Sequence, residues 1–436
     1  MKRQLSELAW VVGGQALTAL GTVVGVRILT QFLPPSAYGT VSLALGLSVL
    51  AISLVAAPLT QAAIHFYPSV TVEGSARELL ASVLRCYRSM SPWVVAASLV
   101  AGVAYVASGQ GTPLLVVLLT LLLASDCWRS ANLSLLNAAR RQRRYALWMA
   151  SDAWSRPLAA AGAVMLFGPS PVAVLGAYVL VSALLLVVFS SRVWPKEEHE
   201  PSAKDAAERA RRLDARMWQY ALPLLPLGIL SWASTLGDRY VIGASLGVAD
   251  AGVYAAVYGL ASIPFMIVNG TAEQALRPIY QTAVSRGDRP KARRILLFWF
   301  SGVVAVCCVG VLVFVFGHEL LASLVVAQPY RRASGLMPWI ATGYAIRAAS
   351  YVLERVSYAY GKTRRVLLTQ VCAVAATAIV TPLGVFTLGI RGAAMAVPVY
   401  FSIQFVTAAI LARRTIREAR SSGSDASVGK ALPTSA

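Results

Sequence analysis

The sequence predicts an all-α polytopic membrane protein with about twelve transmembrane helices in two six-helix lobes, and three observations lead to this prediction. The 436 residues are 57% hydrophobic and only 13% charged, with a mean hydropathy of +0.64, whereas about a quarter of the residues of a soluble domain are charged. Apolar stretches long enough to cross a bilayer as helices, about 20 residues each, recur along the chain. Lys and Arg residues gather in alternate connections between these stretches, as in multi-pass membrane proteins.

The first predicted span, residues 7–33, follows Lys2 and Arg3. It is too long for the apolar region of a signal peptide, and no small-residue cleavage site interrupts it. The other predicted spans are 40–66, 90–108, 113–137, 146–167, 171–191, 218–245, 251–272, 295–317, 336–359, 366–388 and 392–412.

The distribution of positive charge sets the orientation of these spans. With both termini inside, only Arg331, Arg332 and Arg391 of the 39 Lys and Arg residues fall in outer loops. Most of the others lie in inner connections, which include a basic cluster at residues 140–144. An incorrect number of spans would invert the later loops and remove this asymmetry, so the count supports twelve spans with cytoplasmic termini.

A charged linker, residues 193–217, separates a lobe at 1–192 from a lobe at 218–413, and the composition of 414–436 predicts a disordered cytoplasmic tail. The two halves also resemble each other when one is shifted by 213 positions. The shift superimposes Gly39, Gly46, Leu47, Val55, Gln61, Ala62 and Tyr67 on Gly252, Gly259, Leu260, Val268, Gln274, Ala275 and Tyr280. Six helices per half give a parallel repeat, which is typical of transporters. The alternative is a coincidence between two similar helix pairs.

Charged side chains inside the predicted spans are the main functional candidates. They are Asp126, Asp152, Asp238 and Glu354, with Arg27, Arg129, Arg156, Arg239, Arg347 and Arg355. A charge near the bilayer centre costs at least ~2.5–3.5 kcal/mol, so such groups usually face protein or water. Arginines outnumber acids and no Lys is among them, which indicates a cationic interior suited to a phosphate-bearing anion.

Two alternatives stay open for these charges. Arginines near a helix end, such as Arg27 and Arg239, can extend to the lipid headgroups. The spacing of Asp126 with Arg129, and of Asp152 with Arg156, places each pair on one helix face, where the two charges can neutralise each other.

The sequence argues against several other classes of function. The five cysteines and three histidines show no metal-ligand spacing and no disulfide framework, so we expect no metal and no cofactor. The segment Gly361–Thr363 is similar to the end of a phosphate-binding loop but lacks the preceding glycine, since residue 356 is Val. No loop is large enough for a catalytic domain, so an enzyme is not expected. The net charge of +20 is accounted for by membrane topology rather than by nucleic-acid binding.

Two sequence patterns, one in each half of the chain, carry a family resemblance. The first pattern, R-x-L-x-x-x-L-x-x-x-x-Y-G, is matched by Arg27, Leu29, Leu33, Tyr38 and Gly39. The second, D-R-x-x-I-x-x-x-x-G-x-x-x-x-G-x-Y, is matched by Asp238, Arg239, Ile242, Gly247, Gly252 and Tyr254. Both patterns resemble those of the Wzx-like bacterial polysaccharide flippases, in the superfamily that includes the MATE exporters. The lipid II flippase branch of that superfamily usually has two more helices than are predicted here.

This resemblance implies a flippase that moves a polyprenyl-diphosphate-linked oligosaccharide from the cytoplasmic to the outer leaflet by alternating access. We expect Arg156 and Arg347, with Arg129 and Arg355, to hold the diphosphate. Asp126, Asp152, Asp238 and Glu354 are candidates for ion or proton coupling; the alternative driving force is the membrane potential. We expect a monomer in the bacterial cytoplasmic membrane that works beside polysaccharide polymerases and glycosyltransferases.

Two other functions stay open. A MATE-like ion-coupled exporter of small cations would have a net acidic interior, whereas the predicted interior is basic. A membrane glycosyltransferase, polymerase or ligase would need sizeable outer loops, and the predicted outer connections are short.

Overall fold

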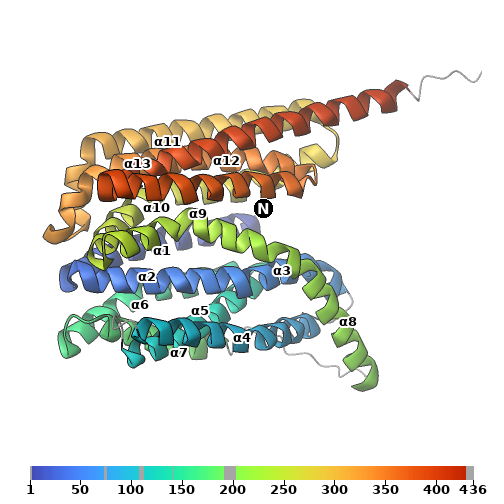
Figure 1. Ribbon diagram of the computed structural model, residues 1–436. Helices are drawn as coiled ribbons and strands as arrows, with labels where there is room; N and C mark the ends of the chain where they lie inside the picture. Colours follow the sequence, from blue (N-terminus) through green and yellow to red (C-terminus); the bar gives the residue numbers. More distant parts are fainter. Residues whose placement is uncertain (1, 73–75, 108–111, 140, 191–202, 429–436) are drawn as a thin grey trace, which may run out of the picture. The chain divides into compact units, whose positions relative to one another are not determined.

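The computed structural model is helical throughout, and no strand occurs in residues 2–72, 76–107, 112–139, 141–190 and 203–428, which are the residues that it describes (Figure 1). The predicted all-α fold class is therefore confirmed. A continuous helix satisfies every backbone polar group within the segment, which is a requirement for a chain that crosses lipid.

The helices follow the predicted spans closely. The first half contains α1 (Lys2–Phe32), α2 (Pro35–Ala51), a π-helical turn (Ile52–Ala56), α3 (Ala57–Val72), α4 (Ala76–Ala107), α5 (Pro113–Ala138), α6 (Gln142–Phe167) and α7 (Pro171–Ser190). The second half contains α8 (Ala203–Ala221), a 3-10 turn (Leu222–Leu224), α9 (Leu225–Ser245), α10 (Val248–Ser285), α11 (Arg289–Val325), a 3-10 helix (Gln328–Leu336), α12 (Met337–Ala359) and α13 (Thr363–Val428).

Proline and glycine mark the ends of these helices. Pro35, Pro113 and Pro171 each occupy the first helical position, where the missing N–H would have no partner in any case. Gly389 interrupts α13 with a φ of 61°, a backbone conformation that favours glycine. Two helices therefore adjoin there, between the predicted spans 366–388 and 392–412.

Seven helical stretches within the described ranges are long and apolar enough to cross a membrane. Helices α6 and α12 are not among them, because their charged residues lower their mean hydropathy. These two helices carry Asp152, Arg156, Arg347, Glu354 and Arg355.

The chain forms two compact units. Unit 1 consists of Met1–Ala256 and Val325–Arg331, and unit 2 consists of Val257–Leu324 and Arg332–Ala436. The division into lobes at 1–192 and 218–413 stays a prediction.

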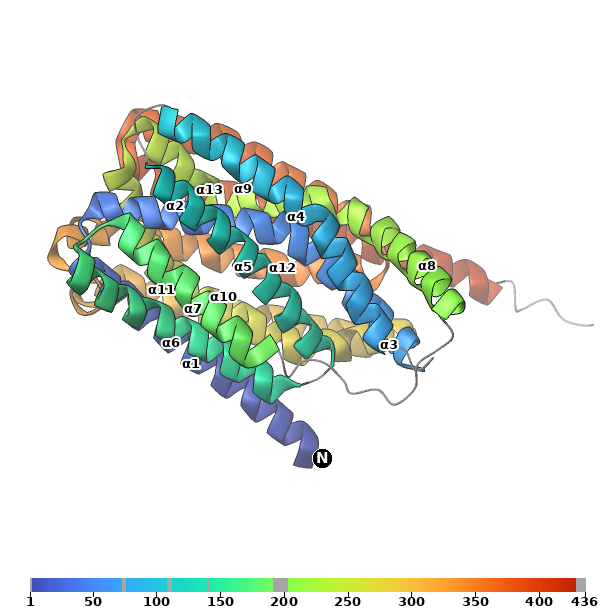
Figure 2. The same ribbon diagram turned by 90° about the horizontal axis from the view of Figure 1, so that it is seen from below.

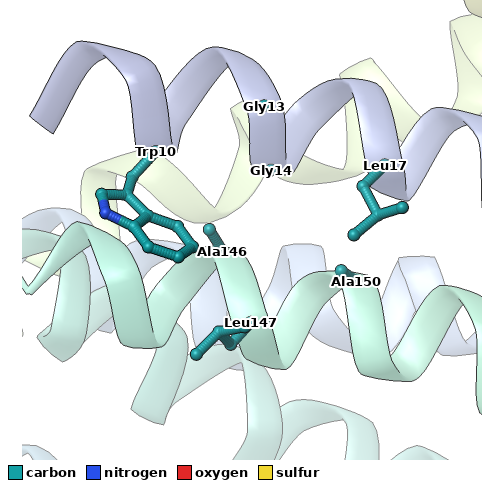
Figure 3. A pocket seen from close by; sticks show the side chains of 7 residues that line it. All are labelled: Trp10, Gly13, Gly14, Leu17, Ala146, Leu147 and Ala150. Carbon is teal, nitrogen blue, oxygen red and sulfur yellow. The ribbon is translucent and has the colours of Figure 1, made fainter. Parts of the chain in front are cut away.

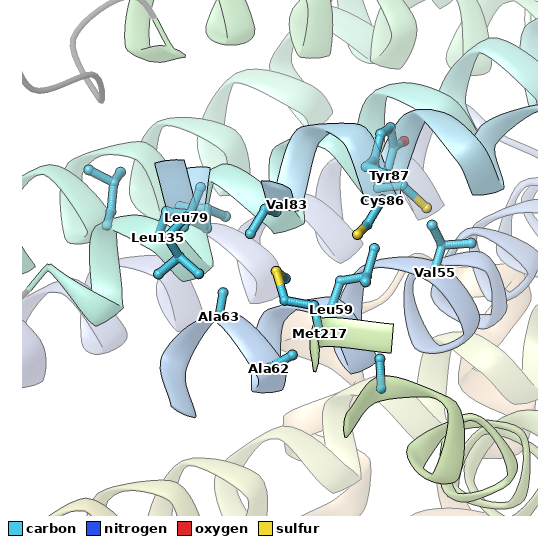
Figure 4. Close-up of a cluster of buried hydrophobic side chains, with 14 of the residues drawn as sticks. Val55, Leu59, Ala62, Ala63, Leu79, Val83, Cys86, Tyr87, Leu135 and Met217 are labelled. Atoms are coloured by element: carbon cyan, nitrogen blue, oxygen red, sulfur yellow. The ribbon is translucent and has the colours of Figure 1, made fainter. Parts of the chain in front are cut away.

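In unit 1, α1 packs along α6, α6 along α7, and α7 along α5 (Figure 2). Helices α3, α4 and α5 enclose a hydrophobic core in which Val55, Leu59 and Val83 are almost completely buried (Figure 4). Within a bilayer, close van der Waals packing of such side chains, rather than their removal from water, favours the association of the helices.

The predicted linker contains α8, which packs on α3 and α4 (Figure 2). Its residues 193–202 lie outside the described part of the chain. Met217 enters the core (Figure 4), and the neighbouring Asp214 receives two bonds from Arg85, at 2.8 Å from Nε and 2.9 Å from Nη2. These contacts anchor the end of the charged linker to the other helices of unit 1.

The first turns of α2 and α10 meet at two glycines. A Cβ on Gly39 would clash with the carbonyl of Val248 and the amide of Gly252, and a Cβ on Gly252 would clash with the carbonyl of Pro35 and with Gly39. Under the shift of 213 positions, Pro35 becomes Val248 and Gly39 becomes Gly252. The contact of Gly39 with Val248 therefore corresponds to the contact of Gly252 with Pro35. Such a reciprocal contact lies on a local two-fold axis, so the sequence repeat is matched by symmetry in the structure at this point.

In unit 2, aromatic side chains join the helices. The ring centroids of Phe265 on α10 and Phe314 on α11 are 6.2 Å apart. The ring centroid of Tyr344 on α12 lies 5.6 Å from those of Tyr258 on α10 and Phe401 on α13. Edge-to-face and tilted ring pairs at such separations are favourable.

The first part of the C-terminal segment is helical. Helix α13 continues to Val428, and residues 429–436 lie outside the described ranges. Arg365 bonds to Glu418 and, at 2.7 Å, to Thr415, while Arg289 donates to the carbonyl of Ala419 at 2.8 Å. These contacts join the start of the tail, up to Ala419, to α11 and to the start of α13. The disordered tail at 414–436 stays a prediction.

Candidate functional site

Two groups of buried residues, one in each unit, contain most of the predicted site residues. The first lies where α5, α6 and α7 of unit 1 are neighbours. Asp126 and Arg129 stand one turn apart on α5, and Asp152 and Arg156 one turn apart on α6. Because each pair is spaced by one helical turn and the two helices are adjacent, the four charged side chains lie at one location.

These four side chains form a closed ring of alternating charge. Arg129 reaches Asp126 at 3.4 Å and Asp152 at 3.3 Å, and Arg156 reaches Asp152 at 2.9 Å and also contacts Asp126. We call these residues the charge ring. Its formal charge is zero, so the structure shows Arg129 and Arg156 bridging carboxylates rather than lining a purely cationic surface.

Helix α7 completes the surroundings of the charge ring. Ser182 accepts a hydrogen bond from Arg156 Nη2 at 2.6 Å, and the ring centroid of Tyr178 lies 5.5 Å from the Arg156 guanidinium carbon. The side chains of Asp126 and Arg156 are only 3% and 11% exposed. At that depth a charge needs partners, because desolvation of an isolated ion costs several kcal/mol.

The second group surrounds Arg347 on α12 of unit 2. Arg347 donates to the hydroxyl of Tyr351 at 2.6 Å and approaches that of Tyr344 at 3.5 Å. Its guanidinium carbon lies 5.0–5.5 Å from the rings of Phe401, Tyr351 and Tyr344. Tyr344 in turn bonds to the hydroxyl of Tyr258 on α10 at 3.1 Å. We call Arg347 and these four aromatic residues the aromatic site.

Glu354 lies two turns further along α12 and is 3% exposed. Its carboxylate accepts hydrogen bonds from Gln404 at 3.0 Å and from Gln370 at 3.4 Å, both on α13. The ion pairs found among the described residues do not include Glu354. The sequence places Glu354 and Arg347 on one helix face, and the structure gives them different sets of partners.

Arg355 pairs with a carboxylate that lies just outside a predicted span. Glu273 of α10 lies 3.0 Å from Arg355 and 3.2 Å from Arg277. Glu273 follows the predicted span 251–272 directly, so it is not among the charges predicted within spans. Its four-residue spacing from Arg277 is the one local signal that could have identified it.

Asp238, in unit 1, has contacts that account for the second sequence motif. Its carboxylate accepts the backbone N–H of Arg239 at 2.8 Å and the hydroxyl of Tyr254 at 2.7 Å. Gly247, with a φ of 100°, forms the turn between α9 and α10 that brings Tyr254 back to Asp238. In the first motif, Arg27 donates to the carbonyl of Val326 at 2.8 Å.

The structure thus brings Arg129 and Arg156 together with Asp126 and Asp152 in unit 1. In unit 2, Arg347 and Arg355 both lie near the ring of Tyr351, at 5.1 and 6.0 Å. Within the described ranges, no three His, Cys, Asp or Glu side chains are grouped so that they could hold a metal ion.

Comparisons with solved structures identify the fold. The inward-facing form of a multidrug resistance MATE family transporter of the MOP superfamily matches with a TM-score of 0.71 and 14% identity, covering 92% of this chain and 96% of that chain. The inward closed form of the lipid II flippase MurJ matches with a TM-score of 0.70 and 11% identity, covering 94% and 87%. The MATE transporter VcmN of Vibrio cholerae, in its bent form, matches with a TM-score of 0.54 and 11% identity, covering 95% and 99%.

A comparison with curated proteins found no match. The polysaccharide biosynthesis protein family, in contrast, matches residues 5–284, which is more than half of the chain. With its helical fold and its apolar spans, the chain is a multi-pass membrane protein that belongs to the polysaccharide biosynthesis protein family.

Proposed function

We propose that the protein moves a polyprenyl-diphosphate-linked oligosaccharide from the cytoplasmic to the outer leaflet of the bacterial cytoplasmic membrane. The observation that carries this proposal is the aromatic site, a buried guanidinium on α12 surrounded by aromatic rings of α12 and α13. The family match supports a role in polysaccharide biosynthesis, and the similar lipid II flippase supports the class of cargo.

The chemistry of the aromatic site suits such a cargo. The planar fork of Arg347 matches the oxygens of a diphosphate and keeps its charge when buried. Tyrosine rings present an apolar face and a hydroxyl to the same ligand, which fits a sugar with its apolar and hydrogen-bonding surfaces. Arg355 lies near the ring of Tyr351, which also contacts Arg347, and is the second candidate for binding the diphosphate.

The charge ring provides a second place for an anion. Arg129 and Arg156 each bridge two carboxylates, so a diphosphate would bind there by displacing Asp126 or Asp152. We therefore assign Arg347 the primary role and the charge ring a conditional one.

Transport needs no ATP in this proposal. Moving one elementary charge across 100 mV is worth ~2.3 kcal/mol, and an anion that leaves a negative interior moves downhill. The protein would alternate between inward-open and outward-open states while the polyprenyl tail stays in lipid. It would act as a monomer without catalysing a reaction, beside the enzymes that build and polymerise the glycan.

The test replaces Arg347 with Gln at constant expression and measures surface glycan. A charge-assisted hydrogen bond contributes about 1.5–3 kcal/mol, so we expect a loss of about tenfold or more. Arg277→Gln is the matched control, since Arg277 also lies in unit 2 but its side chain is 42% exposed. If Arg347→Gln and Arg277→Gln leave the same amount of surface glycan, the assignment of Arg347 is wrong.

The second candidate is an ion-coupled exporter of small molecules. The fold is also that of MATE transporters, and Glu354 is a buried carboxylate bonded to amides, an arrangement able to accept a cation. Drug susceptibility of a deletion strain distinguishes the two functions. A strain that becomes drug-sensitive while its surface glycan stays intact would favour the exporter.

A further inference from the structure

Helices α1 and α6 of unit 1 approach each other closely at three glycines of α1. A Cβ on Gly14 would lie 2.5 Å from Ala146 Cβ, one on Gly21 would lie 2.8 Å from the Trp154 ring, and one on Gly25 would lie 3.0 Å from Pro157. These small residues allow the two helices to approach closely, as small residues do at helix interfaces within membranes.

At one end of this interface a groove of about 320 Å³ opens between the two helices (Figure 3). Trp10 and Leu17 stand at its two ends on α1, and the glycines between them leave the space unfilled. A Cβ on Gly13 would meet no atom within 4 Å. Helix α6 contributes Ala146, Leu147 and Ala150. We call this space the α1–α6 groove.

The α1–α6 groove is apolar and open to its surroundings. The exposed fractions of Trp10, Leu17 and Leu147 are 38%, 46% and 41%. From Trp10 to Leu17 the groove follows about two turns of α1, roughly 10 Å. A narrow apolar groove of this length on a membrane-spanning unit fits a hydrocarbon chain, and among the lining side chains only the indole N–H of Trp10 could bond to a sugar.

Positive charge stands at the Trp10 end. The guanidinium carbon of Arg143 lies 5.4 Å from the centroid of the Trp10 ring, within the range of a cation–π interaction. Arg143 and the adjacent Arg144 are both exposed. The groove therefore combines an apolar channel with a cationic end, which is the complement of a lipid with an anionic headgroup.

We propose that the α1–α6 groove binds an anionic phospholipid, with an acyl chain between Trp10 and Leu17 and the headgroup phosphate at Arg143 and Arg144. The lipid would lie in the membrane leaflet at the level of Arg143, near the start of α6. This site is separate from the charge ring and the aromatic site. The proposal does not rest on the proposed transport function.

The experiment uses Trp10 as a reporter in the full-length protein, reconstituted without any polyprenyl lipid. Bromine atoms on an acyl chain quench a nearby indole, and the Trp10 signal is the difference between the protein and its Trp10→Phe variant. Brominated phosphatidylglycerol is compared with brominated phosphatidylcholine at the same low mole fraction. Each basic residue near an anionic lipid favours binding by about fivefold, so we expect several-fold stronger quenching by phosphatidylglycerol.

Three variants locate the site. Arg143→Gln with Arg144→Gln should abolish the preference for phosphatidylglycerol, and Gly13→Leu should reduce quenching by both lipids because it fills the groove. Gly162→Leu is the matched control, since Gly162 also has open space around a Cβ but lies outside the groove on α6. Quenching in the Gly162→Leu protein should equal that of the unchanged protein.

Two results would overturn the proposal. One is equal quenching by the two lipids in the unchanged protein, a comparison that does not depend on whether any variant folds. The other is a preference for phosphatidylglycerol that survives the loss of both arginines. Neither result would affect the assignment of Arg347, which is tested by surface glycan.

Discussion

Arg156 and Arg347 are both buried, in helices that the sequence predicts to span the membrane, yet they have different surroundings. Arg156 lies between two carboxylates and a serine, whereas Arg347 lies among tyrosines and a phenylalanine. Carboxylates neutralise a guanidinium, while hydroxyls and ring faces stabilise it and leave its charge in place. This difference is the reason for assigning the primary anion-binding role to Arg347.

Removing one carboxylate from the charge ring should destabilise unit 1. Asp126→Asn leaves Arg156 and Arg129 with an excess of buried positive charge, and breaking a buried pair in this way costs about 3–5 kcal/mol. The measurement is unfolding of the purified protein in detergent. The double variant Asp126→Asn with Arg156→Gln should recover much of the loss, because both opposite charges are removed together.

Ser182→Ala is the comparison variant, since it removes a neutral partner of Arg156 and keeps the charges balanced. It should destabilise the protein less than Asp126→Asn does. Equal stability of Asp126→Asn and the unchanged protein would mean that the charge ring contributes nothing to the packing of α5 on α6.

Glu354 is the residue to test for ion coupling. Glu354→Gln preserves the size of the side chain and its position between Gln370 and Gln404, but it prevents any change of charge. Transport in vesicles should then stop responding to an imposed proton or sodium gradient. Glu273→Gln, which removes a carboxylate held by two arginines, should keep the response. A Glu354→Gln protein that still follows the gradient would exclude Glu354 as the coupling residue.

At the scale of helices, the two motif glycines show why glycine is needed there. Gly39 of α2 and Gly252 of α10 contact each other's backbone, and any side chain would push the two helices apart. The motif residues Asp238 and Tyr254 hydrogen-bond to each other across the turn between α9 and α10. These motif positions thus form one structural junction, which gives Asp238 a structural role beside its predicted part in coupling.

Gly39→Ala should therefore lower the stability of the protein toward unfolding. Overpacking against backbone costs typically about 1–3 kcal/mol, and backbone atoms cannot move aside as a flexible side chain can. Gly259→Ala is the matched control, because a Cβ there meets no atom within 4 Å and Ala favours the helix more than Gly does. Unfolding midpoints in detergent should fall for Gly39→Ala and stay level or rise for Gly259→Ala. The opposite order would argue against the glycine contact.

At the scale of the whole molecule, the asymmetry of Lys and Arg predicts the orientation in the membrane. In a variant without native cysteines, Arg391→Cys should react with an impermeant thiol reagent added outside intact cells. Lys362→Cys should react only after the membrane is permeabilised, because its loop belongs to the basic, inner set. Labelling of Lys362→Cys in intact cells would mean that the orientation in the membrane is the reverse of the predicted one.

Much of the fold follows from local sequence. The apolar length of a span is a property of about 20 consecutive residues, so nearly all the described residues of the predicted spans lie in helical structure. The pairs Asp126 with Arg129 and Asp152 with Arg156 were also predictable, since both partners lie on one helix face. Local sequence does not identify the partners of the segment after the last span, where Glu418 bonds to Arg365 and the carbonyl of Ala419 bonds to Arg289.

The partners across helices were not predictable in the same way. Arg156 meets Asp126 from 30 positions away, Arg355 meets Glu273 from 82 positions away, and Glu354 meets Gln404 from 50 positions away. Hydropathy and charge along the chain determined that this protein spans a membrane and carries arginines inside it. Only the tertiary structure decided which arginines are neutralised, because the rotation of each helix and the choice of its neighbours depend on side-chain packing between segments far apart in sequence.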